Sequence, residues 1–233
     1  MSPAVTVEIW STDFSGFPGP VEHLVERLSA DERARFESRR EPGLRRLFLL
    51  RRAMLRGILG LDRSTATPFD YGPHGKPSLS RPGAPRFSLS HAGAFSVLAL
   101  WGGGKIGVDV ALEEVLPDLD RLVTRAFGPE ERARFQELPP ELRLGAFYGA
   151  WTQKEALLKA LGTGLSLEPD LFAVEVDPRA APRLRFSRSP LLLPASWDLY
   201  ALSLPGPYCG ALALEGGAHA TLRYRAFDVL SLA

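Results

Sequence analysis

The sequence predicts an α+β fold made of two similar halves, residues 1–104 and 105–233, packed together as an intramolecular pseudo-dimer. One reason is that the pentapeptide ERARF occurs at residues 32–36 and again, letter for letter, at residues 131–135. A second reason is that longer segments align in the same order along both halves. These are residues 7–9 with 108–110, residues 48–59 with 151–161, and residues 87–103 with 200–217 after one inserted residue. Four aligned blocks in one order indicate a duplication.

The first half is predicted to contain one strand, two helices and a hairpin. Residues 5–10 alternate in polarity as a short strand does. Ser29 and Glu32 match a capping box that begins a helix reaching residue 40. Residues 44–60 place their apolar side chains on one helical face. The remaining elements are a Pro- and Gly-rich loop at residues 71–85 and hairpin strands at residues 87–91 and 95–101.

The second half is predicted to begin with a strand and to contain one long amphipathic helix. In the strand at residues 106–112, the apolar side chains point to one face, so Asp109 projects from the other. From residue 142 onward, apolar side chains recur at three- and four-residue steps, and Gly162 and Gly164 end this helical pattern. Glu155 interrupts the apolar face of that helix, and Lys159 follows one turn later.

The composition excludes several classes of protein. The formal net charge of +1 argues against a dedicated nucleic-acid binder, although arginines dominate residues 33–63 and acids dominate residues 107–141. Cys209 is the only cysteine, so no intrachain disulfide can form. The N-terminus lacks the pattern of a signal peptide, and no apolar run approaches the roughly 18 residues of a membrane span. We therefore expect a cytoplasmic monomer that binds neither nucleic acid nor membranes.

Asp109 and Glu155 are candidate ligands for a divalent cation. One strand carboxylate and one helix carboxylate, completed by water and phosphate oxygens, form the kind of shell that Mg²⁺ accepts. Duplication also predicts that Arg52 and Arg56 face the second half across a cleft, where they could attract phosphates. The simpler alternative is that Glu155 and Lys159 form an ordinary surface pair at i,i+4.

Four motifs resemble the signature of the 4′-phosphopantetheinyl transferases in order and spacing. They are GKP at residues 75–77, FSLSH at 87–91, GVDV at 107–110 and WTQKEALLKALGTGL at 151–165. The resemblance is to the two-halved, pseudo-dimeric type that activates carrier proteins of polyketide, nonribosomal peptide and siderophore synthesis. The duplication was inferred independently of this resemblance, and it is what that type of transferase would show.

The resemblance implies an enzyme with coenzyme A as donor, Mg²⁺ as cofactor and a serine hydroxyl of an apo carrier protein as acceptor. By this likeness, Asp109 and Glu155 bind Mg²⁺, Glu155 helps to deprotonate the serine, and Lys159 neutralises charge on the leaving 3′,5′-ADP. Other positions would contact coenzyme A. These are Arg46, Arg52, Gly75, Lys76, Pro77, Ser90 and His91.

One position departs from the family pattern. The strand of the family commonly reads G-[IV]-D-[IV]-E, and Ala111 stands here in place of the final acid. Water could replace this third carboxylate, because Mg²⁺ commonly keeps several waters. Glu113 lies on the same strand face but about 7 Å further along, which is too far without a bulge. We therefore expect the missing acid to change the affinity for the metal more than the function.

Three interpretations remain open at this stage. The first is an active transferase, and the second is a silent relative that binds coenzyme A or carrier proteins without transfer. The third is another phosphate-binding protein that uses the basic region of the first half, for example for nucleic acid. Residues 113–127 contain apolar groups that either receive a helix of the carrier protein or pack on their own half.

Overall fold

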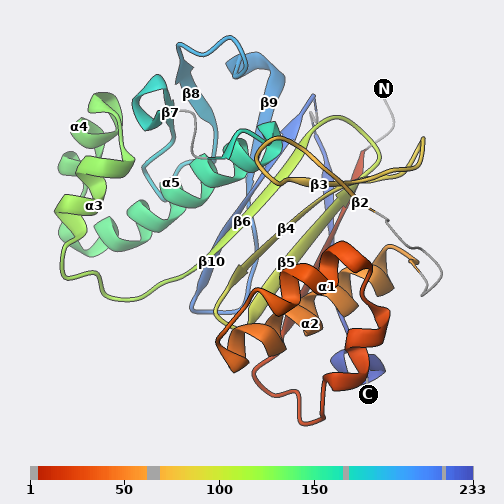
Figure 1. Ribbon diagram of the computed structural model, residues 1–233. Coiled ribbons are helices and arrows are strands. Elements are labelled where there is room, and N and C mark those ends of the chain that lie inside the picture. The colour runs from red at the N-terminus through yellow and green to blue at the C-terminus, as the bar shows by residue number, and fades with distance from the viewer. Residues whose placement is uncertain (1–4, 62–68, 165–167, 217–218, 233) are drawn as a thin grey trace.

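The computed structural model describes residues 5–61, 69–164, 168–216 and 219–232, and it confirms a mixed fold of helices and sheets (Figure 1). Leu165 and Gly217, which belong to the predicted motif and alignment, lie outside these residues. The strands are β1 Thr6–Asp13, β2 Phe69–Tyr71, β3 Pro77–Leu79, β4 Arg86–Ala92, β5 Phe95–Trp101, β6 Ile106–Leu112, β7 Phe172–Val174, β8 Leu184–Ser187, β9 Trp197–Ala201, β10 Tyr208–Glu215 and β11 Thr221–Ala226. The α-helices are α1 Ala30–Glu37, α2 Pro42–Ile58, α3 Leu119–Ala126, α4 Pro129–Glu137 and α5 Pro140–Leu161.

The same strand order occurs twice. In the first sheet, β1, β5 and β4 are antiparallel neighbours in that order, and in the second sheet β6, β10 and β9 repeat the arrangement. Each set is joined to a short helix followed by a long helix, α1 with α2 and α4 with α5. This repetition agrees with the duplication that the sequence indicates.

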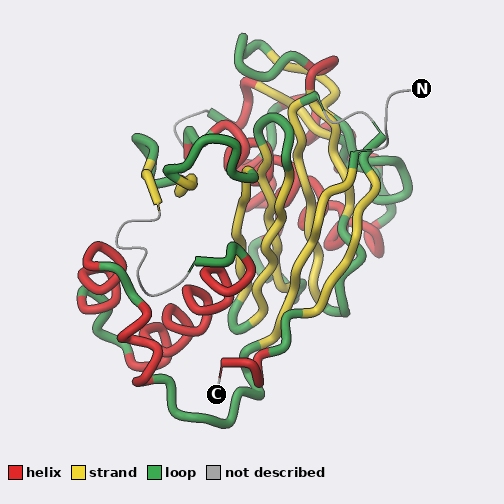
Figure 2. Tube along the Cα trace, turned by 90° about the vertical axis from the view of Figure 1, so that its right-hand side faces the viewer, coloured by secondary structure: helices red, strands yellow, loops and turns green. Residues whose placement is uncertain are grey.

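The two sheets pack against each other, and the helices cover the outer sides (Figures 1 and 2). Alternate side chains of β5 face the two sides of its sheet. Val97 and Ala99 belong to the core between the sheets, whereas Leu98 packs toward α1 and α2. On β6, Val108 and Val110 likewise face the first sheet. The opposite face of β6, which carries Asp109 as predicted, is therefore turned toward α5.

The last described residues return to the first half. Strand β11 pairs with β1 in parallel, from Thr6 with Thr221 to Ser11 with Ala226. Leu232 is 2% exposed and belongs to the core beneath α2. The division into two halves between residues 104 and 105 stays a prediction. The last described residues belong to the second half in sequence but pack against the first half.

The predicted element ends agree with the structure to within a few residues. The capping box of Ser29 and Glu32 is present, and α5 ends at Gly162, whose φ of 74° is the left-handed conformation that glycine favours. The first strand is longer than predicted, and the loop at residues 71–85 contains part of the small β2–β3 pair. Among the described helices, none is long and apolar enough to cross a membrane.

A buried ion pair holds the helices together in each half. Glu131 is 0% exposed, and the Lys154 ammonium lies 2.7 Å from its Oε2 and 2.9 Å from its Oε1. In the first half, Glu32 is also 0% exposed, and its Oε2 lies 3.1 Å from Arg56 while its Oε1 lies 3.8 Å from Arg52. Arg52 and Arg56 therefore face the acid of their own half and not the second half, because a buried carboxylate requires a charged partner.

Candidate active site

Two serine side chains join the edges of the two sheets. The Ser88 hydroxyl accepts a hydrogen bond from the backbone N–H of Val108 at 3.0 Å, and the Ser90 hydroxyl accepts one from Val110 at 3.3 Å. We call this line, where residues 88–90 of β4 meet residues 108–110 of β6, the inter-sheet seam. The alternating serines of FSLSH therefore place β4 of the first half beside the strand that carries Asp109.

Gly107 allows α5 to approach this strand closely. A Cβ atom at residue 107 would lie 2.0 Å from the carbonyl oxygen of Ala156 and 2.4 Å from the backbone nitrogen of Ala160. Contacts this short are impossible for any other residue unless the helix moves. Because Ala156 and Ala160 directly follow Glu155 and Lys159, the close approach brings those two residues to Asp109.

Asp109, Ser90 and Lys159 form one hydrogen-bonded cluster across the seam. The Lys159 ammonium donates to Asp109 Oδ1 at 2.6 Å and to the Ser90 hydroxyl at 2.7 Å. The Ser90 hydroxyl also lies 2.8 Å from Asp109 Oδ1. Three predicted site residues from β4, β6 and α5 thus meet at one point, and Asp109 is 7% exposed there.

Glu155 lies half-buried beside this cluster and makes no hydrogen bond or ion pair with the described residues. Burial, and next the negative charge of Asp109, raise the pKa of Glu155, while Lys159 partly opposes the shift. Within the described chain, Asp109 Oδ2 also has no hydrogen-bond partner. Two carboxylates that repel each other and keep free oxygens suit a shared divalent cation. No described cluster supplies three or more His, Cys, Asp or Glu ligands, consistent with Ala111.

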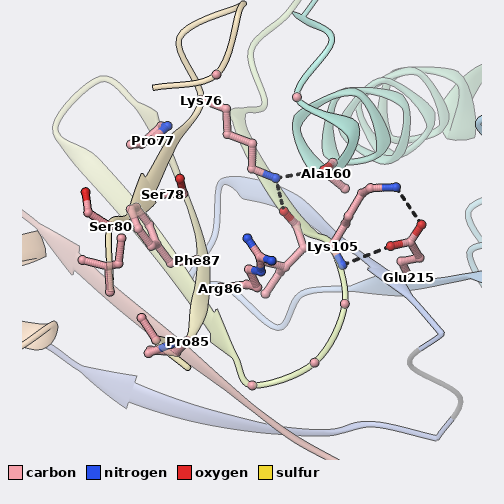
Figure 3. A pocket seen from close by; sticks show the side chains of 18 of the residues that line it. Lys76, Pro77, Ser78, Ser80, Pro85, Arg86, Phe87, Lys105, Ala160 and Glu215 are labelled. Carbon is pink, nitrogen blue, oxygen red and sulfur yellow. Dashed lines mark hydrogen bonds and ion pairs between the residues drawn. The ribbon is translucent and has the colours of Figure 1, made fainter. Parts of the chain in front are cut away.

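Lys76 lies where the start of β6 meets the end of α5. Its ammonium donates to the carbonyl oxygens of Ile106 and Ala160, each at 2.9 Å (Figure 3). Gly75 precedes it with a φ of 80° in a turn, so glycine is favoured there. Burial, followed by the positive charges of Arg86 and Lys105, lowers the pKa of Lys76 to about 8. These surroundings favour an anion as an additional partner.

A cavity of about 840 Å³ adjoins Lys76 and Pro77 (Figure 3). Arg86 also lines it, and Lys105 contributes an ammonium that is paired with Glu215 at 2.8 Å. Asp109, Glu155 and Lys159 do not line this cavity. The chemistry of the candidate site therefore follows from the cluster on the seam and not from the size of this cavity.

His91 follows Ser90 at the end of β4, and cations surround it. The residue keeps a solvent-exposed edge, and burial of the rest of the ring, together with Arg51, Lys159 and Arg39, lowers the pKa of His91 to about 4. None of the four motifs contains Arg39 or Arg51, although both lie in the arginine-rich segment at residues 33–63. A neutral imidazole among cations is a favourable place for an anionic group to bind.

Arg46 and Arg52 lie apart from the cluster, in contacts within the first half. Arg46 donates to the carbonyl oxygens of Phe17 and Gly19 at 2.7 and 3.0 Å. Arg52 is near Glu32, as described above. A role for either residue in donor binding stays a prediction and would require an exchange of these partners.

The segment after β6 divides into an exposed part and a packed part. Val115 is 84% exposed, whereas Val123 on α3 and Phe127 are 5% and 3% exposed in the core of the second half. The segment therefore packs on its own half, as one of the two expectations had it, and its contact with a helix of the carrier protein stays a prediction.

Comparison with known proteins assigns the family. Residues 105–213 match the model of the 4′-phosphopantetheinyl transferase superfamily. The 4′-phosphopantetheinyl transferase HetI of Nostoc sp. is 34% identical over 217 residues, which are 91% of this chain and 88% of HetI. The chain belongs to the 4′-phosphopantetheinyl transferases. The predicted family and enzyme class are thereby confirmed.

Other relatives of this transferase match over shorter regions. A Synechocystis sp. protein named for the same activity is 37% identical over 144 residues, which are 60% of this chain but only 58% of that protein. The solved structure of the Thermotoga maritima holo-[acyl-carrier-protein] synthase matches with a TM-score of 0.38 and 23% identity, over 47% of this chain and 61% of its own. The fold of the transferase therefore rests on the helices and strands described above and not on this likeness.

Proposed function

We propose that this transferase moves the 4′-phosphopantetheine arm of coenzyme A to a serine hydroxyl of an apo carrier protein and releases 3′,5′-ADP. The family supports phosphopantetheinyl transfer in general. The observation that carries the finer proposal is the cluster on the inter-sheet seam, where the Lys159 ammonium and Asp109 lie 2.6 Å apart beside the free carboxylate of Glu155.

We propose that Asp109 and Glu155 hold Mg²⁺, because the charge of Asp109 acts on the neighbouring Glu155 carboxylate and both residues keep oxygens that no described group occupies. When bound, the cation would neutralise charge on the pyrophosphate of the donor. With Ala111 in place of a third acid, we expect water to complete the shell and a weak affinity for the ion.

The protein side chains would then act as follows. The serine oxygen forms a bond to the phosphorus of the transferred group, and the bond from that phosphorus to the leaving 3′,5′-ADP oxygen breaks. The serine proton passes to the Glu155 carboxylate, directly or through one water. The Lys159 ammonium stabilises the negative charge that grows on the leaving group.

The cations around the seam would hold the donor. We propose that Lys76 and His91 contact its phosphates and adenosine end, with Gly75 and Pro77 forming the loop around Lys76. Ser90 would position Lys159, since its hydroxyl accepts a hydrogen bond from the Lys159 ammonium at 2.7 Å and lies 2.8 Å from Asp109 Oδ1.

The deciding experiment is the intact mass of a generic apo carrier protein after incubation with coenzyme A, Mg²⁺ and the full chain. We expect the mass to rise by one phosphopantetheine group and 3′,5′-ADP to appear in equal amount. Binding of coenzyme A with no mass change would favour the silent relative, for which the missing acid at Ala111 is the supporting observation.

The setting of the reaction is also a proposal. We propose a cytoplasmic monomer that serves a pathway of secondary metabolism and has neither nucleic acid nor membrane as a partner. Sedimentation of the protein alone and with an apo carrier protein tests the first part, since a pseudo-dimer already contains both halves of its interface. A stable homodimer would contradict it.

A further inference from the structure

A second cavity, of about 230 Å³, lies between the first half of α5 and the strands β9 and β10. Small residues form most of its wall, and the segment at residues 175–182 closes one side. Neither Asp109 nor Glu155 lines it. The proposed transfer reaction therefore gives this cavity no role.

Two glycines leave the backbone of α5 open toward this cavity. Gly145 and Gly149 lie inside the helix, four residues apart, and both line the cavity. A Cβ atom at either position would meet nothing within 4 Å. Since glycine destabilises a helix interior relative to alanine, and no packing against the described residues requires it here, the empty space is available to a ligand.

Gln153, one further turn along the same helix face, supplies an unsatisfied acceptor. It lines the cavity and is 6% exposed. Its amide nitrogen donates to the carbonyl oxygens of Gly149 at 3.2 Å and Glu175 at 2.9 Å, which fixes the orientation of the amide. Its Oε1 is buried and has no hydrogen-bond partner in the part of the chain that the structure describes. A buried acceptor of this kind is costly unless a donor reaches it.

The charge of the cavity favours a cation. Glu113 lines it, and its carboxylate, which lies near the Cys209 thiol, forms no ion pair with any described residue. The carboxylate of Glu175 differs, because Arg183 and Arg185 already neutralise it at 3.1 and 2.6 Å. Gln153 and Glu113 thus present an unsatisfied acceptor and a negative charge to one small space.

We propose that this cavity binds a small cation with N–H donors, an alkylammonium or a guanidinium group. One N–H donates to Gln153 Oε1, the positive charge lies near Glu113, and the hydrocarbon part packs against Gly145 and Gly149. The same group occurs on free amines and on the side chains of lysine and arginine. The inference is independent of phosphopantetheine transfer, because no residue of the Asp109 cluster takes part.

Nuclear magnetic resonance on the full chain tests the proposal with ethylammonium and ethylguanidinium as probes. We expect at least one of them to shift the backbone amides of Gly145 and Gly149 and the side-chain amide of Gln153 in a saturable manner. Tetramethylammonium, which has the charge but no N–H group, serves as the control. If neither probe causes a saturable shift, or if tetramethylammonium causes the same shift, the proposal is wrong.

Variants identify the cavity as the place of binding. Gly149→Ala places a methyl group in the cavity without a clash, so it should raise the thermal unfolding midpoint and weaken the binding that shifts Gln153. Gly57→Ala, on α2, is the matched control and should leave cation binding unchanged. Unchanged binding by Gly149→Ala would overturn the proposal. N-acetyl-lysine amide distinguishes the two sources, because tighter binding than ethylammonium indicates a protein side chain and equal binding indicates a free amine.

Discussion

The two halves share a strand order and differ in what lies beside their first strand. In the second half, β6 lies beside β4, and Asp109 meets Ser90 across the seam at 2.8 Å. In the first half, β11 lies beside β1, and Glu8, which aligns with Asp109, accepts hydrogen bonds from Arg225 of β11 at 3.0 and 3.1 Å. The duplication therefore produced two similar strand edges, one at β1 and one at β6. Strand β11 pairs with the edge at β1, whereas β4 lies beside the edge at β6.

The long helices differ in how they neutralise a buried acid. In the first half, Glu32 is paired with Arg56 and lies near Arg52. Arg56 aligns with Lys159 of the second half, and Arg52 aligns with Glu155. In the second half, Lys154 pairs with Glu131 instead. Because Lys154 provides this structural charge, positions 155 and 159 are free to face the seam.

The largest effect is expected from removing these buried acids. Glu131→Gln takes away the carboxylate that neutralises Lys154, and it should lower the free energy of unfolding by about 3–5 kcal/mol. Glu32→Gln should cost a similar amount, because Arg56 loses the corresponding partner. Urea unfolding measures both. A loss below about 1 kcal/mol for either variant would show that its ion pair contributes no more than an ordinary surface pair.

The next effect concerns the charges on the seam. Glu155→Gln and Lys159→Ala should each lower kcat by about 100-fold or more while the protein stays folded, because both groups handle charge that grows in the transition state. Glu8→Gln, at the position that aligns with Asp109, is the control and should leave kcat unchanged. Transfer is measured by the mass of the carrier protein. Losses below about tenfold for both seam variants would contradict a role of Glu155 and Lys159 in the transition state.

Gly107 is a further difference between the two halves, since Thr6 occupies the aligned position on β1. Gly107→Ala should destabilise the protein by about 1–3 kcal/mol and also lower kcat, because α5 must move away from Asp109 to make room. Thr6→Val should leave kcat unchanged. If Gly107→Ala had normal activity and stability, the close approach of α5 would not be what assembles the site.

His91 aligns with Leu204 of the second half, so of these two aligned hairpins only the first carries an imidazole. The pKa of His91 is lowered from 6.5 to about 4. Between these values the unfolded chain binds a proton that the folded protein does not. The free energy of unfolding therefore falls as the pH decreases through this range. Binding of 3′,5′-ADP should raise the pKa of His91 by about one unit, or about 1.4 kcal/mol. Imidazole resonances measure this, and an equal shift with 5′-AMP would exclude contact with the 3′-phosphate.

The smallest effect is expected at Ala111, which lies opposite Cys209 in the second sheet. Ala111→Glu adds a carboxylate on the strand face of Asp109, so it should lower the Mg²⁺ concentration for half-maximal activity about threefold. Asp109→Ala should abolish metal-dependent activity with or without this change. A Mg²⁺ titration of the three proteins would contradict the proposed metal site if Ala111→Glu left the midpoint unchanged and Asp109→Ala stayed active.

Local patterns in the sequence were sufficient for much of this structure. Alternation along residues 106–112 predicted β6 and the face of Asp109, and the glycine after Leu161 predicted the end of α5. These features depend on neighbours in sequence, so a single chain contains the information. The metal and donor roles of the predicted residues stay predictions, whereas the meeting of Asp109, Ser90 and Lys159 is now a structural fact.

Other features depend on partners that no local pattern specifies. Strand β11 has an ordinary alternating sequence, and nothing within it shows that it pairs with β1. Glu32 and Glu131 resemble exposed acids of a first helical turn, yet both are fully buried. The repeated ERARF could have indicated their role, because an acid kept in both copies just after a helix start suggests a shared internal contact.

The pairing of β1 with β11 also has a consequence for synthesis. Glu8 and Arg225, which join these strands, are 217 positions apart, so β1 leaves the ribosome long before its neighbour exists. Throughout that time the first sheet presents an open edge, which is a template for pairing with other chains. A chain cut before Thr221 would retain every residue of the inter-sheet seam, and we expect it to aggregate all the same.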